Sequence, residues 1–91
     1  MNDARVRRVR FRAWRRGFRE ADLILGPFAD SCAQDFTPDE LARFERLLDE
    51  ADHDLYGWAT GAAAVPARLD DRIMDALKAF CRSRPMNSAG G

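Results

Sequence analysis

Glycine and proline divide this 91-residue chain into short segments, and the longer segments have the apolar spacing of helices. The dividing residues are Gly17, Pro27, Pro38, Gly61 and Pro66. β-Branched residues are scarce, with three Val, two Ile and two Thr, and no alternation of apolar and polar residues is long enough for a strand. We therefore expect an all-α fold, a compact five-helix bundle that forms a single domain over residues 1–84. Residues 85–91 are expected to be a disordered tail.

The first two helices are expected on either side of Gly17, because glycine suits a bend better than a helix interior. The first helix should begin after Asn2 or Asp3, with Val6, Val9 and Ala13 as its apolar stripe and Phe11 and Trp14 on another side. The second should bury Phe18, Ala21, Leu25, Phe28 and Cys32. Pro27 lacks the N–H that would bond to the carbonyl of Leu23, so a kink or break is expected there.

The third helix has the clearest start in the chain. Thr37 can cap it, Pro38 suits its first position, and Glu40 can complete a capping box. Its core stripe is expected to be Leu41, Phe44, Leu48 and Ala51.

Two shorter signals predict the remaining helices. Asp52 is expected to cap a fourth helix over residues 54–59 that ends at Gly61. A fifth helix is expected over residues 67–82, ended by Pro85. Its core positions are Leu69, Ile73, Leu77 and Phe80.

The net charge of zero hides a strong polarity along the chain. Residues 1–19 hold eight Arg and one Asp, whereas residues 20–75 hold 14 acidic residues and four Arg. We therefore do not expect a uniformly basic nucleic-acid binder, although a local basic head remains. We interpret the Arg-rich start as part of the fold and not as a transit peptide. Its arginines should lie near acids of the third or fourth helix, or point toward a partner.

Side chains that carry catalysis or bind metal are few. His53 is the single histidine, Cys32 and Cys81 have no metal-site spacing, and no glycine-rich phosphate loop is present. The uncharged stretch 55–67 is too short to span a bilayer. We therefore expect a protein that is not an enzyme, with reduced thiols, no bound metal and no membrane insertion.

The segment with the most functional information contains Arg16, Gly17 and Glu20. On a continuous helix, Arg16 and Glu20 would share one face, with the bare backbone of Gly17 beside them. That arrangement could dock against another protein. The plainer interpretation is that Gly17 joins two helices and Glu20 is a favourable first-turn acid. The residues alone leave both interpretations open.

The same segment resembles the small succinate dehydrogenase assembly (flavinylation) factors, which share an Arg-Gly-x-x-Glu motif. The resemblance extends through Asp22, the Leu23–Phe28 stretch, the acidic third helix and the run Asp54-Leu55-Tyr56-Gly57-Trp58. It implies a helical bundle without catalytic activity of its own. Such factors bind the flavoprotein subunit of succinate dehydrogenase, and often of fumarate reductase, and promote covalent attachment of FAD to a histidine of that subunit.

The resemblance also implies a site and a compartment. Arg16, Gly17 and Glu20, with Asp22 as a further candidate, are the expected partner-binding residues. FAD would be attached to the partner, so no cofactor is expected to be tightly bound by this chain. We expect a monomer, cytoplasmic in a bacterium or in the mitochondrial matrix in a eukaryote. The alternative is an Arg-headed nucleic-acid-binding or antitoxin-like regulatory module, because the eight arginines of residues 5–19 could contact phosphates.

Overall fold

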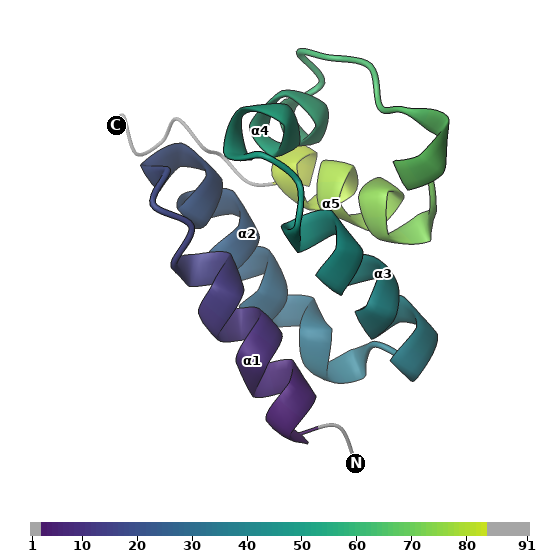
Figure 1. Cartoon of the computed structure of the whole chain (residues 1–91). Coiled ribbons are helices and arrows are strands. Elements are labelled where there is room, and N and C mark those ends of the chain that lie inside the picture. Colours follow the sequence, from purple (N-terminus) through teal and green to yellow (C-terminus); the bar gives the residue numbers. More distant parts are fainter. Residues whose placement is uncertain (1–2, 84–91) are drawn as a thin grey trace.

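The computed structural model describes residues 3–83, which form five α-helices and two short 3-10 helices (Figure 1). In chain order the elements are α1 (Asp3–Trp14), α2 (Arg19–Cys32), η1 (Ala33–Asp35), α3 (Pro38–Leu48), α4 (Asp52–Thr60), η2 (Ala67–Leu69) and α5 (Arg72–Ser83). The predicted all-α fold with five helices is confirmed, and residues 3–83 contain no strand. Asn2, Pro85 and the expected tail over 85–91 lie outside the described residues.

Helices α1 and α2 run side by side and form one arm of the bundle (Figure 1). Val9 and Ala13 of α1 are completely buried, so the Arg-rich start is part of the fold, as predicted. Gly26 of α2 lies directly beneath the indole ring of Trp14, and a Cβ atom at Gly26 would overlap that ring. The absence of a side chain at Gly26 therefore lets the two helices pack closely.

Pro27 does not break α2, which continues from Arg19 to Cys32. Of the predicted kink or break, the break is therefore wrong. Leu23, whose carbonyl loses its bond to the missing N–H, is 47% exposed, so this side of the helix is open to water. The buried face of the same turn, with Leu25 and Phe28, packs into the core and holds the helix in place.

Helix α3 begins as the sequence predicts. Thr37 accepts from the backbone N–H of Glu40, and the Glu40 side chain accepts from the backbone N–H of Thr37. Leu41, Phe44 and Leu48 are buried as expected. Ala51 is exposed, because α3 ends at Leu48 and Ala51 is already the residue that precedes α4.

The last two helices begin at residues other than those expected. Helix α4 starts at Asp52, which belongs to its first turn and provides no side-chain cap; its end at Gly61, with φ of +85°, agrees with the prediction. Residues 67–82 are not one helix, because η2 and α5 are separate. Asp71 separates them: its Oδ1 accepts from the backbone N–H groups of Ile73 and Met74 and thereby caps α5.

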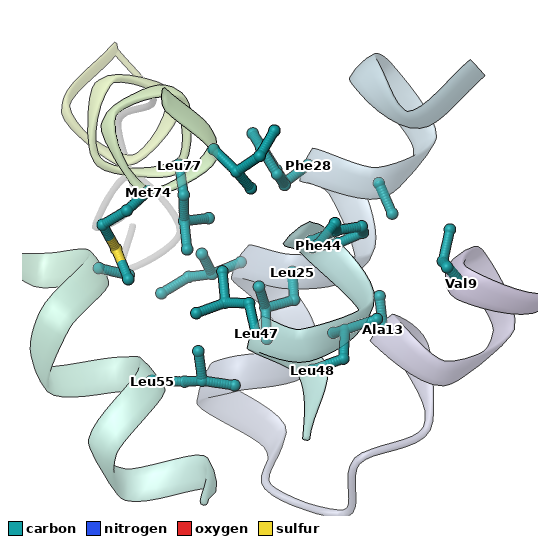
Figure 2. Packing of buried hydrophobic residues seen from close by; sticks show 14 of the residues in the cluster. Val9, Ala13, Leu25, Phe28, Phe44, Leu47, Leu48, Leu55, Met74 and Leu77 are labelled. Carbon is teal, nitrogen blue, oxygen red and sulfur yellow. The ribbon is translucent and has the colours of Figure 1, made fainter. Parts of the chain in front are cut away.

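One apolar core joins all five helices, and Figure 2 shows its centre. Phe28 and Phe44 meet edge to face, with ring centroids 5.5 Å apart. Leu55, Met74 and Leu77 close the core from α4 and α5. Cys32 and Cys81 are partly buried and pack against it. Within residues 3–83 no helix has the length and apolar character needed to cross a bilayer.

Candidate functional site

The turn between α1 and α2, residues 15–18, has a left-handed residue at its centre. Gly17 has φ of +88°, a conformation that glycine adopts without steric strain. The carboxylate of Asp22 accepts from the backbone N–H of Arg16 at 3.0 Å and holds the turn against the start of α2. Gly17 joins two helices and Glu20 lies in the first turn of α2, as the plainer interpretation has it, so Arg16 and Glu20 do not share the face that a continuous helix would have given them.

The side chain of Arg16 points inward, toward the junction of α3 and α4. Its Nε donates to Asp52 Oδ1 at 2.5 Å, and its terminal nitrogens donate to the carbonyl oxygen of Leu48 at 2.6 Å and to the carbonyl oxygen of Glu50. The side chain is only 9% exposed. We call this group, Arg16 with Asp52 and the two carbonyls, the Arg16 clamp.

The Arg16 clamp satisfies groups that the helices leave open. Leu48 ends α3 and Glu50 lies just beyond it, so their carbonyls have no partner in a following helical turn, and a cation near a helix C-terminus is favoured by the helix dipole. We expected Asp52 to cap α4. It does not, because its carboxylate is turned to the Arg16 guanidinium. Arg16 therefore joins the α1–α2 turn to the α3–α4 junction.

Gly17 and Glu20 lie on the outside of the same turn. Both are exposed, and a Cβ atom at Gly17 would meet nothing within 4 Å. Among residues 3–83, the side chain of Glu20 makes no hydrogen bond or ion pair. The motif is thus divided: Arg16 and Asp22 are used inside the protein, whereas the Gly17 backbone and the Glu20 carboxylate face solvent.

Arginines of α1 also pair with acids of neighbouring elements: Arg5 and Arg12 reach acids of α3 and its C-terminal end, as predicted, whereas Arg10 reaches an acid of α2, which was not predicted. The ion pairs are Arg5–Glu45 at 2.9 Å, Arg10–Asp30 at 3.0 Å and Arg12–Asp49 at 2.7 Å. The hydrogen bond from the Arg5 guanidinium holds the pKa of Glu45 below its usual value. These pairs neutralise much of the basic head.

Phe18, the last residue of the turn, packs against two rings of α4. The Phe18 ring lies 4.8 Å from the His53 ring and meets Tyr56 edge to face at 5.8 Å, measured between centroids. His53 is exposed and lies in the first turn of α4. Within residues 3–83 no group of His, Cys, Asp and Glu is arranged to hold a metal ion.

Two of these contacts have no local signal in the sequence. Asp52 lies 36 positions from Arg16, and Trp14 lies 16 positions from Asp30, whose carboxylate accepts from its Nε1 at 3.1 Å. Both pairings depend on how the helices pack, which a single sequence does not specify.

The chain is similar to known proteins. Residues 7–81 match the family model described as the flavinator of succinate dehydrogenase. Succinate dehydrogenase assembly factor 2-B, a mitochondrial protein of Drosophila willistoni, is 35% identical over 78 residues, which are 84% of this chain and 50% of the relative. Mitochondrial succinate dehydrogenase assembly factor 2 of Lodderomyces elongisporus is 41% identical over 72 residues, which are 76% of this chain and 44% of that protein.

A third relative has the same name. Mitochondrial succinate dehydrogenase assembly factor 2 of Schizosaccharomyces pombe is 30% identical over 83 residues, which are 90% of this chain and 60% of that protein. The chain thus spans about half the length of the curated relatives it matches. The family match extends from the first turns of α1 to the last turn of α5 and includes the whole α1–α2 turn. The chain therefore belongs to the family of flavinators of succinate dehydrogenase.

Proposed function

We propose that this chain is an assembly factor that binds the flavoprotein subunit of succinate dehydrogenase, and also that of fumarate reductase, and promotes covalent attachment of FAD to a histidine of that subunit. The family description and the names of the relatives support this function. FAD belongs to the flavoprotein, which we call the client, and this chain has no tightly bound cofactor. It acts as a monomer, in the mitochondrial matrix in a eukaryote, as the relatives' names suggest, or in the cytoplasm in a bacterium.

The observation that carries the proposal is the outward-facing part of the α1–α2 turn. We call Gly17 and Glu20 with the exposed backbone between them the turn surface. Gly17 has no side chain, so a client segment can approach its backbone closely. Glu20 makes no bond within residues 3–83, so its carboxylate is available to a client donor. Arg16 and Asp22 contribute to binding by fixing the shape of this turn and not by direct contact.

Such a surface can promote flavin attachment without an acid or a base of its own. If the chain binds the client conformation that is competent for attachment more tightly than other conformations, it raises the population of that conformation. The bond-forming chemistry then belongs to the flavin and the client histidine. The nucleic-acid alternative is not favoured, because Arg5, Arg10, Arg12 and Arg16 are all paired with carboxylates.

The test uses two glycines with the same backbone conformation. Gly17 and Gly61 have φ of +88° and +85°, and neither has an atom within 4 Å of its Cβ position. Asparagine tolerates this conformation better than other non-glycine residues, so Gly17→Asn and Gly61→Asn should have similar small effects on stability. Only Gly17→Asn places a side chain on the turn surface.

The measurement is covalent FAD on the flavoprotein subunit in cells that lack their own factor and express each variant. We expect flavinylation with the wild-type chain and with Gly61→Asn, and strongly reduced flavinylation with Gly17→Asn and Glu20→Ala. Glu20→Ala should leave the protein folded, since a first-turn acid contributes about 0.3–1 kcal/mol. Absence of flavinylation with the wild-type chain would refute the function. Full flavinylation with both Gly17→Asn and Glu20→Ala would refute the site.

A further inference from the structure

Helix α1 has an outer face on which aromatic and cationic side chains alternate. Phe11 is 59% exposed and Trp14 is 41% exposed. Arg7 lies one helical turn before Phe11, and Arg15 lies one turn after it, with its guanidinium carbon 4.6 Å from the centroid of the Phe11 ring. A surface depression of about 550 Å³ is lined by these four residues together with Arg10 and Asp30. We call Arg7, Phe11, Trp14 and Arg15 the α1 outer face.

Internal packing accounts for only part of this face. Trp14 covers Gly26 and donates to Asp30, so its ring has a role in the fold. Phe11 has no comparable role, because more than half of it is exposed and it is absent from the core. Arg7 and Arg15 form no ion pair among residues 3–83, whereas Arg10 beside them pairs with Asp30. The face therefore has one unburied aromatic ring between two cations without carboxylate partners.

We propose that the α1 outer face binds an acidic segment of the client, in which carboxylates flank an apolar side chain. The apolar group would cover the Phe11 ring, and the carboxylates would pair with Arg7 and Arg15, each as a charge-assisted hydrogen bond. Exposed aromatic and arginine side chains are the types that most often dominate binding energy at protein interfaces. The inference rests on the proposed function, because the client is taken to be the flavoprotein subunit.

The α1 outer face leads toward the α1–α2 turn. Phe11 and Arg15 also line a second depression, of about 420 Å³, whose other residues include Arg16, Ala51 and Asp52 at the Arg16 clamp. A segment that crosses Phe11 would therefore reach the turn that holds Gly17. One client could use both surfaces at once, and binding to the second would then be favoured by binding to the first.

A protein segment fits this face better than nucleic acid does. Asp30 lies in the same depression and would repel a phosphate placed beside it. The carboxylates of a protein segment can be spaced to reach Arg7 and Arg15 and to avoid Asp30. Single-stranded nucleic acid is nevertheless the natural competitor in the test.

The experiment measures the dissociation constant of the full chain for the purified flavoprotein subunit without FAD, over a range of salt concentrations. The variants are Phe11→Ala and the double variant Arg7→Ala/Arg15→Ala. Arg46→Ala is the matched control, since Arg46 is exposed on α3 and forms no ion pair among residues 3–83. Trp14 is left unchanged because its ring packs on Gly26. Thermal unfolding of each variant shows that all chains are folded at the temperature of the assay.

We expect Phe11→Ala to weaken binding about tenfold or more, as removal of an interface hot spot does. The double arginine variant should bind the client more weakly at low salt. Its dissociation constant should also change less with salt concentration, because two ion pairs that salt weakens are removed. Arg46→Ala should bind as the wild-type chain does. In a parallel titration, a single-stranded oligonucleotide should not compete with the client.

Three outcomes would overturn the inference. If both variants bind the client as tightly as the wild-type chain while Gly17→Asn binds weakly, the α1 outer face is not an interface, although the proposed function stands. If the wild-type chain does not bind the client at all, the proposed function fails and this inference fails with it. If the two variants lose affinity only for the oligonucleotide, the face is a nucleic-acid site.

Discussion

The Arg16 clamp gives the sharpest test of how this fold is held together. Replacement of Arg16 by alanine removes the side-chain hydrogen bonds to Asp52, to the Leu48 carbonyl and to the Glu50 carbonyl. Asp52, whose side chain is 29% exposed, would keep its charge without a partner. Arg12→Ala is the matched control, because Arg12 pairs with Asp49, whose side chain is 70% exposed.

The two variants should differ several-fold in their effect on the free energy of unfolding. Loss of one partner from a buried ion pair destabilises a protein by about 3–5 kcal/mol. Because Asp52 is partly exposed, we expect Arg16→Ala to lower the free energy of unfolding by about 3 kcal/mol, near the lower end of that range. The free energy of unfolding of a typical domain is roughly 5–15 kcal/mol, so this loss is a large part of it. For the exposed pair, Arg12→Ala should be destabilising by no more than about 1 kcal/mol.

The assay is urea-induced unfolding followed by far-ultraviolet circular dichroism, with the slope against urea compared among variants. Arg16→Lys is measured as well, in case Arg16→Ala does not fold. A lysine keeps a charge near Asp52 but loses the planar fork that reaches both carbonyls, so we expect a loss of about 1–2 kcal/mol. Equal destabilisation by Arg12→Ala and Arg16→Ala would refute the argument that the clamp is a partly buried, structural contact.

Three further predictions concern the rest of the fold. Thr37→Ala should destabilise the protein by about 1 kcal/mol in the same urea titration, because the N-cap of α3 is lost, and an unchanged midpoint would contradict this. Gly26→Ala should be destabilising by about 1–3 kcal/mol and should change the Trp14 fluorescence, since the new methyl group overlaps the indole; wild-type stability would show that the ring can move freely. Because Arg5 lowers the pKa of Glu45 in the folded protein, that carboxylate stabilises the fold above its ordinary pKa of 4.5, and this contribution is lost as the pH falls through the lowered value. Unfolding measured from neutral to acidic pH should therefore show a smaller acid loss for Glu45→Gln than for the wild-type chain.

The parts of the fold that were predictable are those with local signals. The capping box at Thr37 and Glu40 and the left-handed end of α4 at Gly61 each depend on a few neighbouring residues. The errors occurred where packing overrides a local rule. Pro27 remains inside α2 because the buried face of the same turn is fixed in the core, and Asp52 does not cap α4 because Arg16 binds it.

The candidate site shows the same division. The sequence placed Arg16, Gly17 and Glu20 together, but it did not show which of them face outward, because that depends on the sign of φ at Gly17. A helical Gly17 would have put Arg16 and Glu20 on one surface. With φ of +88°, the chain reverses direction, Arg16 turns to α3 and α4, and Glu20 is left on the outside.

This division of roles changes how loss of function at the motif should be interpreted. A substitution at Arg16 acts on the contact between the α1–α2 turn and the α3–α4 junction. It therefore lowers the amount of folded protein and also changes the shape of the turn. A substitution at Glu20 removes a side chain that no residue of 3–83 contacts by hydrogen bond or ion pair, so its effect must arise at the partner. Flavinylation that is lost with Arg16→Ala but restored at low temperature, where the folded fraction recovers, would mark Arg16 as structural. Flavinylation lost with Glu20→Ala should not recover on cooling, because that protein is already folded.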